Sequence, residues 1–353
     1  MGVEEEFFVF DRDAPRLLDI GPEVVAAAER DGADDAQFEK ELKRAQAELA
    51  SSPSTHLDAL ERDLRDRRAE LAQAAARQRA RLIAAGTCPV PGTTQTTDDA
   101  RYRQMAQRFA EVERQQLVCA MHVHVDVASD DEGVAAINGM ARWLPVLLAL
   151  SANSPFAGGI DTGYASYRRI VWDRWPSAGV IGHLADAAEY HRTVAHLVET
   201  GAARDRGMIY FDARLSASYP TVEIRVCDVL PTVDEAATLA GLCRALVATC
   251  AAGEPAEAAR PELVRAAFWR AARWGMSGEL VDLRGDPRLV PAWSLVETLL
   301  DELADALDSA GDSERVRQGV DRIRAGGTGA ARQRAAVRDG DPAQALDVTE
   351  VRP

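Results

Sequence analysis

The pattern of apolar and polar residues predicts a chain in which strands alternate with longer helices. Residues 2–10 carry phenylalanine and valine at strand spacing, and residues 117–127, "LVCAMHVHVDV", alternate between apolar and polar positions. Further strands are expected at 208–214 and 221–228. Helices are expected at 22–32, 98–115, 131–150, 183–201, 232–252, 261–275 and 291–309. Strands separated by helices, each with polar residues on one face, favour an α+β fold with an antiparallel sheet and helices behind it.

Two segments near the N-terminus are harder to assign. Residues 38–54 have helical propensity but end in a Ser/Pro turn signal, so both helix and strand stay open. A long helix is expected from residue 54 or 55 to about 85, capped by Thr55 and Asp58 and ended by Gly86. Its leucine stripe can pack against the sheet or against a second subunit, which leaves room for a homodimer.

The chain after Gly311 is rich in Arg, Asp, Gly and Ala and is weakly patterned. It predicts a helix near 313–325 followed by fraying. We therefore expect one large domain over residues 1–310 and a C-terminal helix and tail over 311–353.

Composition and charge narrow the function classes. The net charge of −15 repels polyphosphate backbones, so nucleic acid is not an expected partner. No run of about 18 apolar residues predicts a membrane span, and the N-terminus does not resemble a secretory signal. Five scattered cysteines without a CxxC pair are typical of reduced thiols in a cytoplasmic protein.

The strands carry chemistry on one face. Residues two apart in a strand share a face, so Glu4 and Glu6 point together while Glu5 points to the other side. The same spacing groups His122, His124 and Asp126 on a second strand, Glu223 and Arg225 on a third, and Gln46 and Glu48 on a fourth if that segment is extended.

A sheet face dense in carboxylates suits magnesium and phosphate. Mg²⁺ prefers carboxylate and phosphate oxygens, and two or three such ions cancel the repulsion among the acids while bridging the oxygens of a nucleotide. His122 can be a further ligand or a hydrogen-bond donor to phosphate.

Each motif also has an ordinary structural interpretation. The three glutamates can lie on a solvated strand edge, "HVHVD" can be a half-exposed strand face, and Glu223 with Arg225 can be a surface ion pair. Because four strands each carry a polar face, a binding or catalytic site is favoured over these separate structural interpretations. None of the standard GxxxxGK[ST], GxGxxG or GxSxG signatures occurs in a supporting context.

Four stretches of the chain resemble one family. The segments "GVEEEF", "CAMHVHV", "SANSPFAGGIDTGYASYR" (151–168) and "VEIRVCD" (222–228) resemble, in order and spacing, the YbdK-type carboxylate–amine ligases, also described as type 2 glutamate–cysteine ligases. The resemblance spans residues 2 to about 310. That family is similar to glutamine synthetases and guanido kinases.

The resemblance implies a fold and a reaction. The expected fold is a curved antiparallel sheet that forms the active-site cup, with helices packed on its outer face. ATP and two or three Mg²⁺ (or Mn²⁺) bind there, a glutamate-like carboxylate becomes an acyl phosphate, and an amino-acid-like amine displaces the phosphate to leave an amide. Residues 1–310 would form the catalytic ligase domain. Segments 87–97 and 157–163 are candidates for a loop that closes over the acyl phosphate.

The resemblance also implies roles for single residues. The metal ligands would be Glu4, Glu6, Glu48, His122 and Glu223. Glu223, Arg225 and Glu48 would be catalytic, with Arg214, Arg225 and His122 contacting the nucleotide. Gln46, Asn153, Tyr164 and Arg168 would line the substrate end. Two alternatives remain: a guanido-kinase-type phosphotransferase that uses the same ATP and magnesium cup, and a His/carboxylate metalloprotein that binds no nucleotide.

Overall fold

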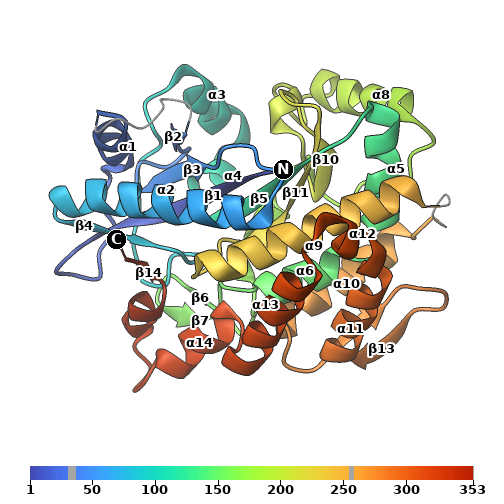
Figure 1. The fold of residues 1–353 in the computed structure, drawn as a ribbon. Coiled ribbons are helices and arrows are strands. Elements are labelled where there is room, and N and C mark those ends of the chain that lie inside the picture. Colours follow the sequence, from blue (N-terminus) through green and yellow to red (C-terminus); the bar gives the residue numbers. More distant parts are fainter. Residues whose placement is uncertain (31–36, 254–257, 353) are drawn as a thin grey trace.

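An eight-stranded sheet runs through the middle of the molecule (Figure 1), whose computed structural model describes residues 1–30, 37–253 and 258–352. Its strand order is β10–β11–β5–β1–β3–β2, and β4 joins β1 to β14. The strands are β1 (Gly2–Asp11), β2 (Phe38–Lys40), β3 (Gln46–Ala50), β4 (Ala80–Ile83), β5 (Ala120–Asp126), β10 (Ala213–Leu215), β11 (Thr221–Asp228) and β14 (Glu350–Val351). Every pairing in this sheet is antiparallel, so the predicted α+β class is confirmed.

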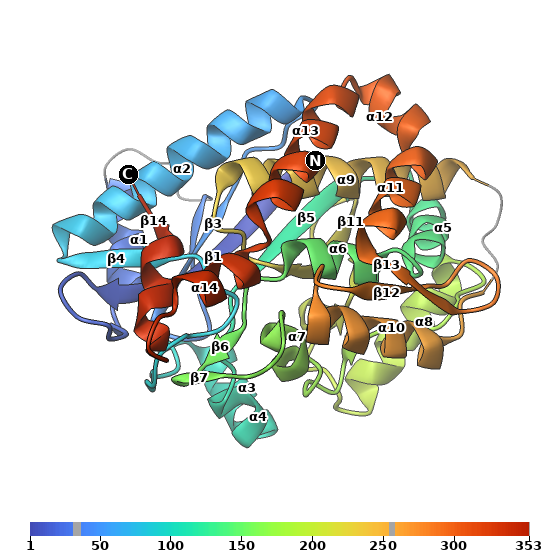
Figure 2. The same cartoon turned by 90° about the horizontal axis from the view of Figure 1, so that it is seen from below.

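Helices cover one face of the sheet. Two long helices, α2 (Leu57–Arg77) and α9 (Val233–Ala252), run along that face (Figure 1), and α13 (Ser313–Gly326) packs on α9. Figure 2 shows α2, α9 and α13 on one side of β1 and β5, with α3 (Ala100–Phe109) and α4 (Glu111–Arg114) on the other side. The remaining helices are α1 (Gly21–Arg30), α5 (Asp130–Met140), α6 (Leu144–Ser151), α7 (Tyr167–Trp172), α8 (Ala187–Glu199), α10 (Pro261–Trp274), α11 (Ala292–Glu302), α12 (Ala304–Ala310) and α14 (Gly329–Ala336).

The N-terminal region differs from the sequence-based expectation. Segment 38–54 forms two strands, β2 and β3, because its alternating residues pair with β1 and with each other. The long helix is shorter than predicted: it ends at Arg77, the chain turns at Arg79 with φ of 57°, and β4 follows. The expected cap at Thr55 and Asp58 and the expected end at Gly86 are therefore wrong; His56 is the N-cap, without a side-chain hydrogen bond.

Three predicted helices are broken in two. Segment 98–115 divides at Ala110, where φ is 49°, into α3 and α4. Segment 131–150 bends by 70° between α5 and α6, and segment 291–309 divides into α11 and α12. A hairpin of β12 (Glu279–Asp282) and β13 (Arg288–Pro291) was not predicted. Short pairs also form between β6 (Phe156–Ala157) and β7 (Ile160–Asp161), and between β8 (Ala178–Gly179) and β9 (Tyr210–Phe211).

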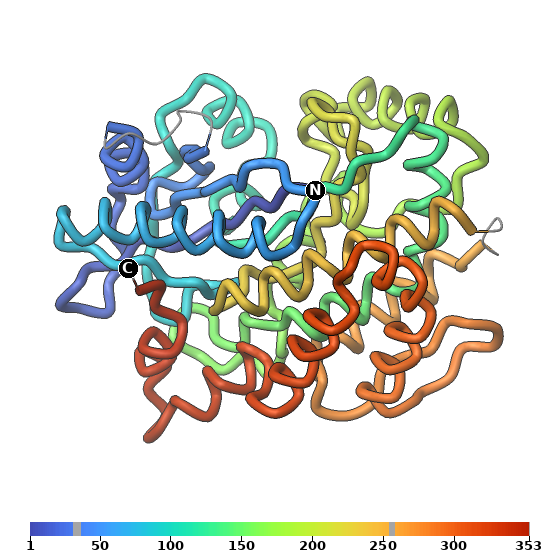
Figure 3. Tube along the Cα trace, viewed as in Figure 1, coloured from blue at the N-terminus to red at the C-terminus, as the bar shows by residue number. Residues whose placement is uncertain are grey.

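The C-terminal region is ordered beyond its predicted helix. After α13 come α14 and a 3₁₀ segment (Pro342–Val348), and β14 pairs with β4, so the predicted fraying is wrong. Figure 3 shows this last segment returning toward the N-terminal half, where the chain ends near α2. Gln333 of α14 donates hydrogen bonds to the backbone and side-chain oxygens of Asn153. The division at residues 310 and 311 stays a prediction.

The helix α9 is apolar enough to raise the question of a membrane. By length and composition it could cross one, but 67% of its apolar window is buried among other elements, as in a core helix. The leucine stripe of α2 is also buried within this chain, so it presents no surface to a second subunit. The cytoplasmic location and the homodimer stay predictions.

The three glutamates of β1 divide between the two faces of the sheet. Glu5 is fully buried on the helix-covered side, where Arg68 of α2 donates two hydrogen bonds to its carboxylate, at 2.8 and 2.5 Å. Arg68 also donates to the backbone oxygens of Leu230 and Pro231. This pair fixes α2 on the sheet and leaves Glu4 and Glu6 to the opposite face.

We expect Arg68→Met to lower the free energy of unfolding by about 3–5 kcal/mol, because it leaves the Glu5 carboxylate buried without a partner. Urea denaturation followed by circular dichroism measures the change. The double variant Glu5→Met/Arg68→Met should be more stable than Arg68→Met alone. As a control, Arg65→Met removes an exposed pair with Glu61 and should cost less than about 1 kcal/mol. Equal costs for the two single variants would contradict this assignment.

Candidate active site

A cavity of about 1180 Å³ opens on the sheet face opposite α2. Its floor consists of side chains from the cavity face of β1, β2, β3, β5, β10 and β11, and residues of α3 and the 216–221 turn form its walls. The cavity therefore brings together residues as distant in the chain as Met1 and Arg225.

The strand register places acids next to one another across the floor. Glu6 of β1 lies opposite Glu48 of β3, and Glu39 of β2 lies opposite Glu48 on its other side. Glu4 lies opposite His122, and Glu223 lies between His124 and Arg214. The predicted common face of Glu4, Glu6, Glu48, His122 and Glu223 is thus present in the structure.

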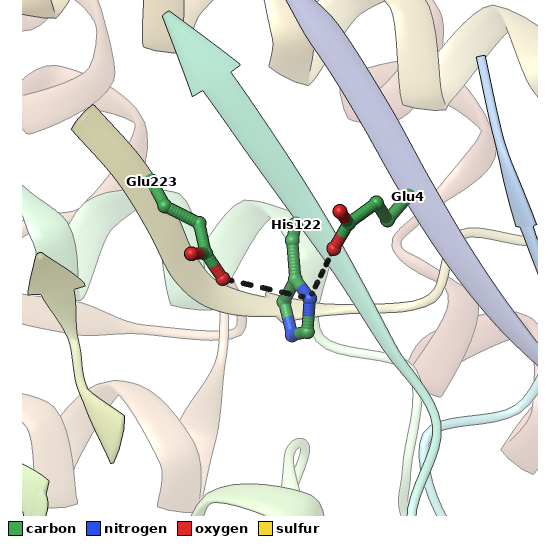
Figure 4. Close-up of side chains that lie close together, drawn as sticks. All are labelled: Glu4, His122 and Glu223. Carbon is green, nitrogen blue, oxygen red and sulfur yellow. Dashed lines mark hydrogen bonds and ion pairs between the residues drawn. The ribbon is translucent and has the colours of Figure 1, made fainter. Parts of the chain in front are cut away.

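Glu4, His122 and Glu223 form a tight cluster (Figure 4). His122 Nδ1 lies 3.2 Å from Glu4 Oε2 and 4.0 Å from Glu223 Oε1, and one ligand atom from each residue lies within 4.8 Å of the others. Burial, and then the nearby Arg225, lower the pKa of His122 to about 4, so its ring is neutral at pH 7.

The cluster fits a divalent cation. A neutral His122 that donates Nδ1–H to Glu4 keeps a lone pair on Nε2, and that buried atom has no hydrogen-bond partner. Imidazole nitrogen and carboxylate oxygens are donors for Mn²⁺ and Mg²⁺. Nδ1 is the ring nitrogen that lies near both carboxylates, so a cation held by all three residues would replace the contact between Nδ1 and Glu4.

The other half of the floor is crowded with uncompensated carboxylates. Burial, and then the charge of Glu41, raise the pKa of Glu6 to about 8. Burial also raises the pKa of Glu48 well above its usual range, with further contributions from Glu41, Glu4 and Glu6. Glu39 shows a raised pKa for the same reasons. A cation here would relieve this repulsion, so this half of the floor fits one as well.

Glu223 differs from these carboxylates because two guanidinium groups donate hydrogen bonds to it. Arg214 Nε donates to Glu223 Oε2 at 2.7 Å, and Arg225 Nη1 donates to Glu223 Oε1. Although burial opposes it, Arg225 and then Arg214 lower the pKa of Glu223 to about 2. Arg225 lies over the rings of Trp172 and Tyr210, and its buried Nε has no hydrogen-bond partner. Arg225 also lines the cavity, so its guanidinium group can contact a phosphate or carboxylate oxygen there.

The predicted substrate residues divide into two groups. Gln46 lines the cavity and donates to the backbone oxygen of Val118. Asn153, Tyr164 and Arg168 are not among the residues that line the cavity, and their role at the substrate end stays a prediction. Asn153 is fully buried and donates to the backbone oxygens of Ala84 and Val229.

Arg168 instead holds a β-bulge from behind. The pairing of β11 with β5 shifts between Ile224 and Cys227, which leaves backbone carbonyls out of the ladder. Arg168 donates to the carbonyl oxygens of Arg225 and Val226, and Ser154 and Ser166 donate to the neighbouring Asp228. The 151–168 segment thus positions Arg225 without touching the cavity. Cys227 is buried.

The sequence interpretation missed Glu39 and Glu41. Both line the cavity: Glu39 lies on β2 and Glu41 directly follows that strand, which the helical propensity of 38–54 concealed. Asp126 is exposed at the rim. Of the two candidate closing loops, 87–97 reaches the cavity through Thr97, whereas 157–163 does not line it.

The raised pKa of Glu6 predicts a pH-dependent stability. Glu6 binds its proton more tightly in the folded protein than in the unfolded chain, because its pKa rises from 4.5 to about 8. The stability of the metal-free protein should therefore fall as pH rises from about 6.5 to 8. The lowered pKa of His122 acts in the opposite direction only below pH 6.5, its ordinary value.

Thermal unfolding in EDTA across this range measures the slope. Glu6→Gln should flatten it, and Mg²⁺ should raise stability most at the alkaline end, where the carboxylates are charged. An equal slope in the wild type and in Glu6→Gln would contradict the assignment.

Comparisons with known proteins identify a ligase family for this chain. The model of the family "Glutamate-cysteine ligase family 2(GCS2)" matches residues 1–347. A Frankia alni protein named putative glutamate–cysteine ligase 2-2 is 47% identical, over 95% of this chain and 92% of that protein.

Two solved structures share the fold. A glutamate–cysteine ligase from Francisella tularensis, in complex with AMP, has a TM-score of 0.67 at 13% identity, over 99% of this chain and 86% of that chain. A bifunctional glutathione synthetase from Pasteurella multocida has a TM-score of 0.69 at 15% identity; this chain is covered to 99% but spans only 51% of that one. The chain belongs to glutamate–cysteine ligase family 2, and the prediction of an ATP-dependent ligase that forms C–N bonds is confirmed.

Proposed function

We propose that this ligase joins a glutamate-like carboxylate to an amino-acid-like amine through an acyl phosphate, releasing ADP and phosphate. The observation that carries the proposal is the meeting, in one cavity, of Glu4, Glu6, Glu48 and Glu223 with His122 and the two arginines of the site. A surface made of so many carboxylates has no use in binding an anionic nucleotide unless divalent cations are bound with it.

The residues that would hold two or three Mg²⁺ or Mn²⁺ fall into the two halves of the floor. Glu4, His122 and Glu223 form one set, and Glu6 and Glu48 form the other, with Glu41 beside them. When bound, such ions supply charge neutralisation of the triphosphate and of the carboxylates.

The chemistry needs activation of a carboxylate. A free carboxylate is a poor electrophile because its leaving group would be oxide, and phosphorylation converts that oxygen into part of a good leaving group. Transfer of the γ-phosphoryl group depends on positioning and on neutralising charge more than on a covalent enzyme nucleophile. The Arg225 guanidinium group, which lines the cavity, can hold the phosphoryl or carboxylate oxygen as charge develops on it.

Gln46 contributes at the substrate end. Its amide N–H₂ group donates to the Val118 carbonyl oxygen and to Cys119 Sγ, so the side chain is fixed with its oxygen as the polar group available to a substrate. Membership in a ligase family favours this reaction over the phosphotransferase and the non-nucleotide metalloprotein.

We expect Glu223→Gln to abolish ADP formation while leaving the fold intact. The substitution removes the negative charge of a carboxylate that belongs to the cation site and that binds both Arg214 and Arg225. The assay contains ATP, Mg²⁺, glutamate and a panel of amines, with products identified by mass spectrometry. Glu297→Gln, at an exposed ion pair with Arg324, is the matched control and should keep full activity. ADP formed without the amine, together with a phosphorylated product, would show a phosphotransferase instead.

Arg225→Lys should lower kcat by about 100-fold or more, since a point charge cannot replace a guanidinium held by Glu223 on one side and two aromatic rings on the other. Steady-state kinetics of the same reaction measure this loss. Activity within about twofold of the wild type would exclude a direct role for the Arg225 guanidinium.

A further inference from the structure

The cavity has two chemically different ends, which the strand register defines. At one end, near Ala120 of β5, lie Glu6 and Gln46; Arg225 lies between this end and the central cluster, because it donates to Glu223 and its charge also acts on Glu6. At the other end, near His124 and Asp126, lie Gly2 and Thr221 with the turn that precedes it. The cluster of Glu4, His122 and Glu223 lies between the two ends.

The charges favour the first end for the carboxylate substrate. The Arg225 guanidinium group lies beside that end, and the fixed amide of Gln46 is there. A nucleotide whose phosphates lie at the central cluster must then extend its base toward the second end.

The second end carries one exposed aromatic ring. Five large hydrophobic side chains are exposed among the described residues, and of these Tyr219, at 64%, is the one that lines the cavity. Its ring meets the His124 ring edge to face, with centroids 6.1 Å apart, and His124 Nε2 lies 3.2 Å from Glu4 Oε1. The Tyr219 ring therefore lies beside His124, next to the central cluster, and most of its surface is exposed.

The turn that carries Tyr219 is held in place. The hydroxyl oxygen of Ser216 accepts hydrogen bonds from the backbone N–H groups of Ser218 and Tyr219. The backbone of Ser216 pairs with Thr221, and the Thr221 hydroxyl bonds to His124 Nδ1 at 3.0 Å. A large aromatic ring exposed on a fixed turn has a low entropy cost for stacking on a flat ligand.

We infer that Tyr219 is the platform on which the base of the nucleotide stacks. This inference rests on the proposed function for the presence of a nucleotide, and it assigns the nucleotide's base to the end of the cavity away from Arg225. Stacking does not read the edge of the base, so Tyr219 contributes affinity for the nucleotide without selecting adenine over guanine.

Calorimetric titration tests the inference without turnover. Tyr219→Ala should weaken binding of ADP with Mg²⁺ by about 5- to 150-fold, the range that loss of one base–aromatic stack produces, whereas Tyr219→Phe should stay within about twofold of the wild type. Binding of inorganic tripolyphosphate with Mg²⁺ should be the same in all three proteins, because it has no base. Trp269→Ala removes an aromatic ring that is 48% exposed and does not line the cavity, and it should change neither titration.

Kinetics provide a second measurement. Tyr219→Ala should raise the KM for ATP and leave kcat and the KM for the carboxylate unchanged. Unchanged ADP binding, or equal weakening of ADP and tripolyphosphate, would overturn the inference. Absence of ligase activity in the wild type, with ADP binding still dependent on Tyr219, would instead contradict the proposed reaction and leave the platform standing.

Discussion

Glu6 of β1 and Glu48 of β3 lie directly opposite each other in the sheet, with Glu39 on the far side of Glu48. Like charges in such positions repel, and burial adds to the cost of charging them. The sheet tolerates this arrangement because helices pack on its opposite face, where the buried pair of Glu5 and Arg68 joins β1 to α2. The carboxylates are thereby kept close together as a preformed binding surface for cations, at the expense of the stability of the metal-free protein.

The supports of this surface are themselves charged and buried. Glu5 is bound by Arg68 on the helix side, and Arg168 satisfies the bulge carbonyls behind Arg225. Beneath the turn between β2 and β3, Lys43 Nζ lies 2.6 Å from Glu113 of α4, and both side chains are buried. These contacts tie β1, β11 and the turn between β2 and β3 to α2, α7 and α4, and they oppose a separation of the strands that carry the cavity residues.

Sequence reasoning found the strands that carry strict alternation and the residues on them. The faces of Glu4, Glu6, His122 and Glu223 followed from the period of two, and Glu48 followed once its segment was taken as extended. The tertiary pairings that decide β2, β3 and β4 are non-local, and local helical propensity in 38–54 and 54–85 pointed the other way. This is why Glu39 and Glu41 were missed.

The same limit applies to Asn153, Tyr164 and Arg168. Their place at the substrate end was an implication of the family resemblance, and nothing in the local pattern of 151–168 could test it. A buried loop needs the same residues to satisfy its own backbone, and Asn153 and Arg168 do so for β4, β11 and their connections. Periodicity cannot tell a loop that binds a ligand from one that binds the chain itself.

Anomalous diffraction from crystals grown with Mn²⁺ and ADP tests most directly whether the crowded carboxylates are a cation site. Two or three manganese peaks are expected in the cavity, bound on one side by Glu4, His122 and Glu223 and on the other by Glu6 and Glu48. A cavity that binds nucleotide with no manganese touching these side chains would contradict this view of the protein.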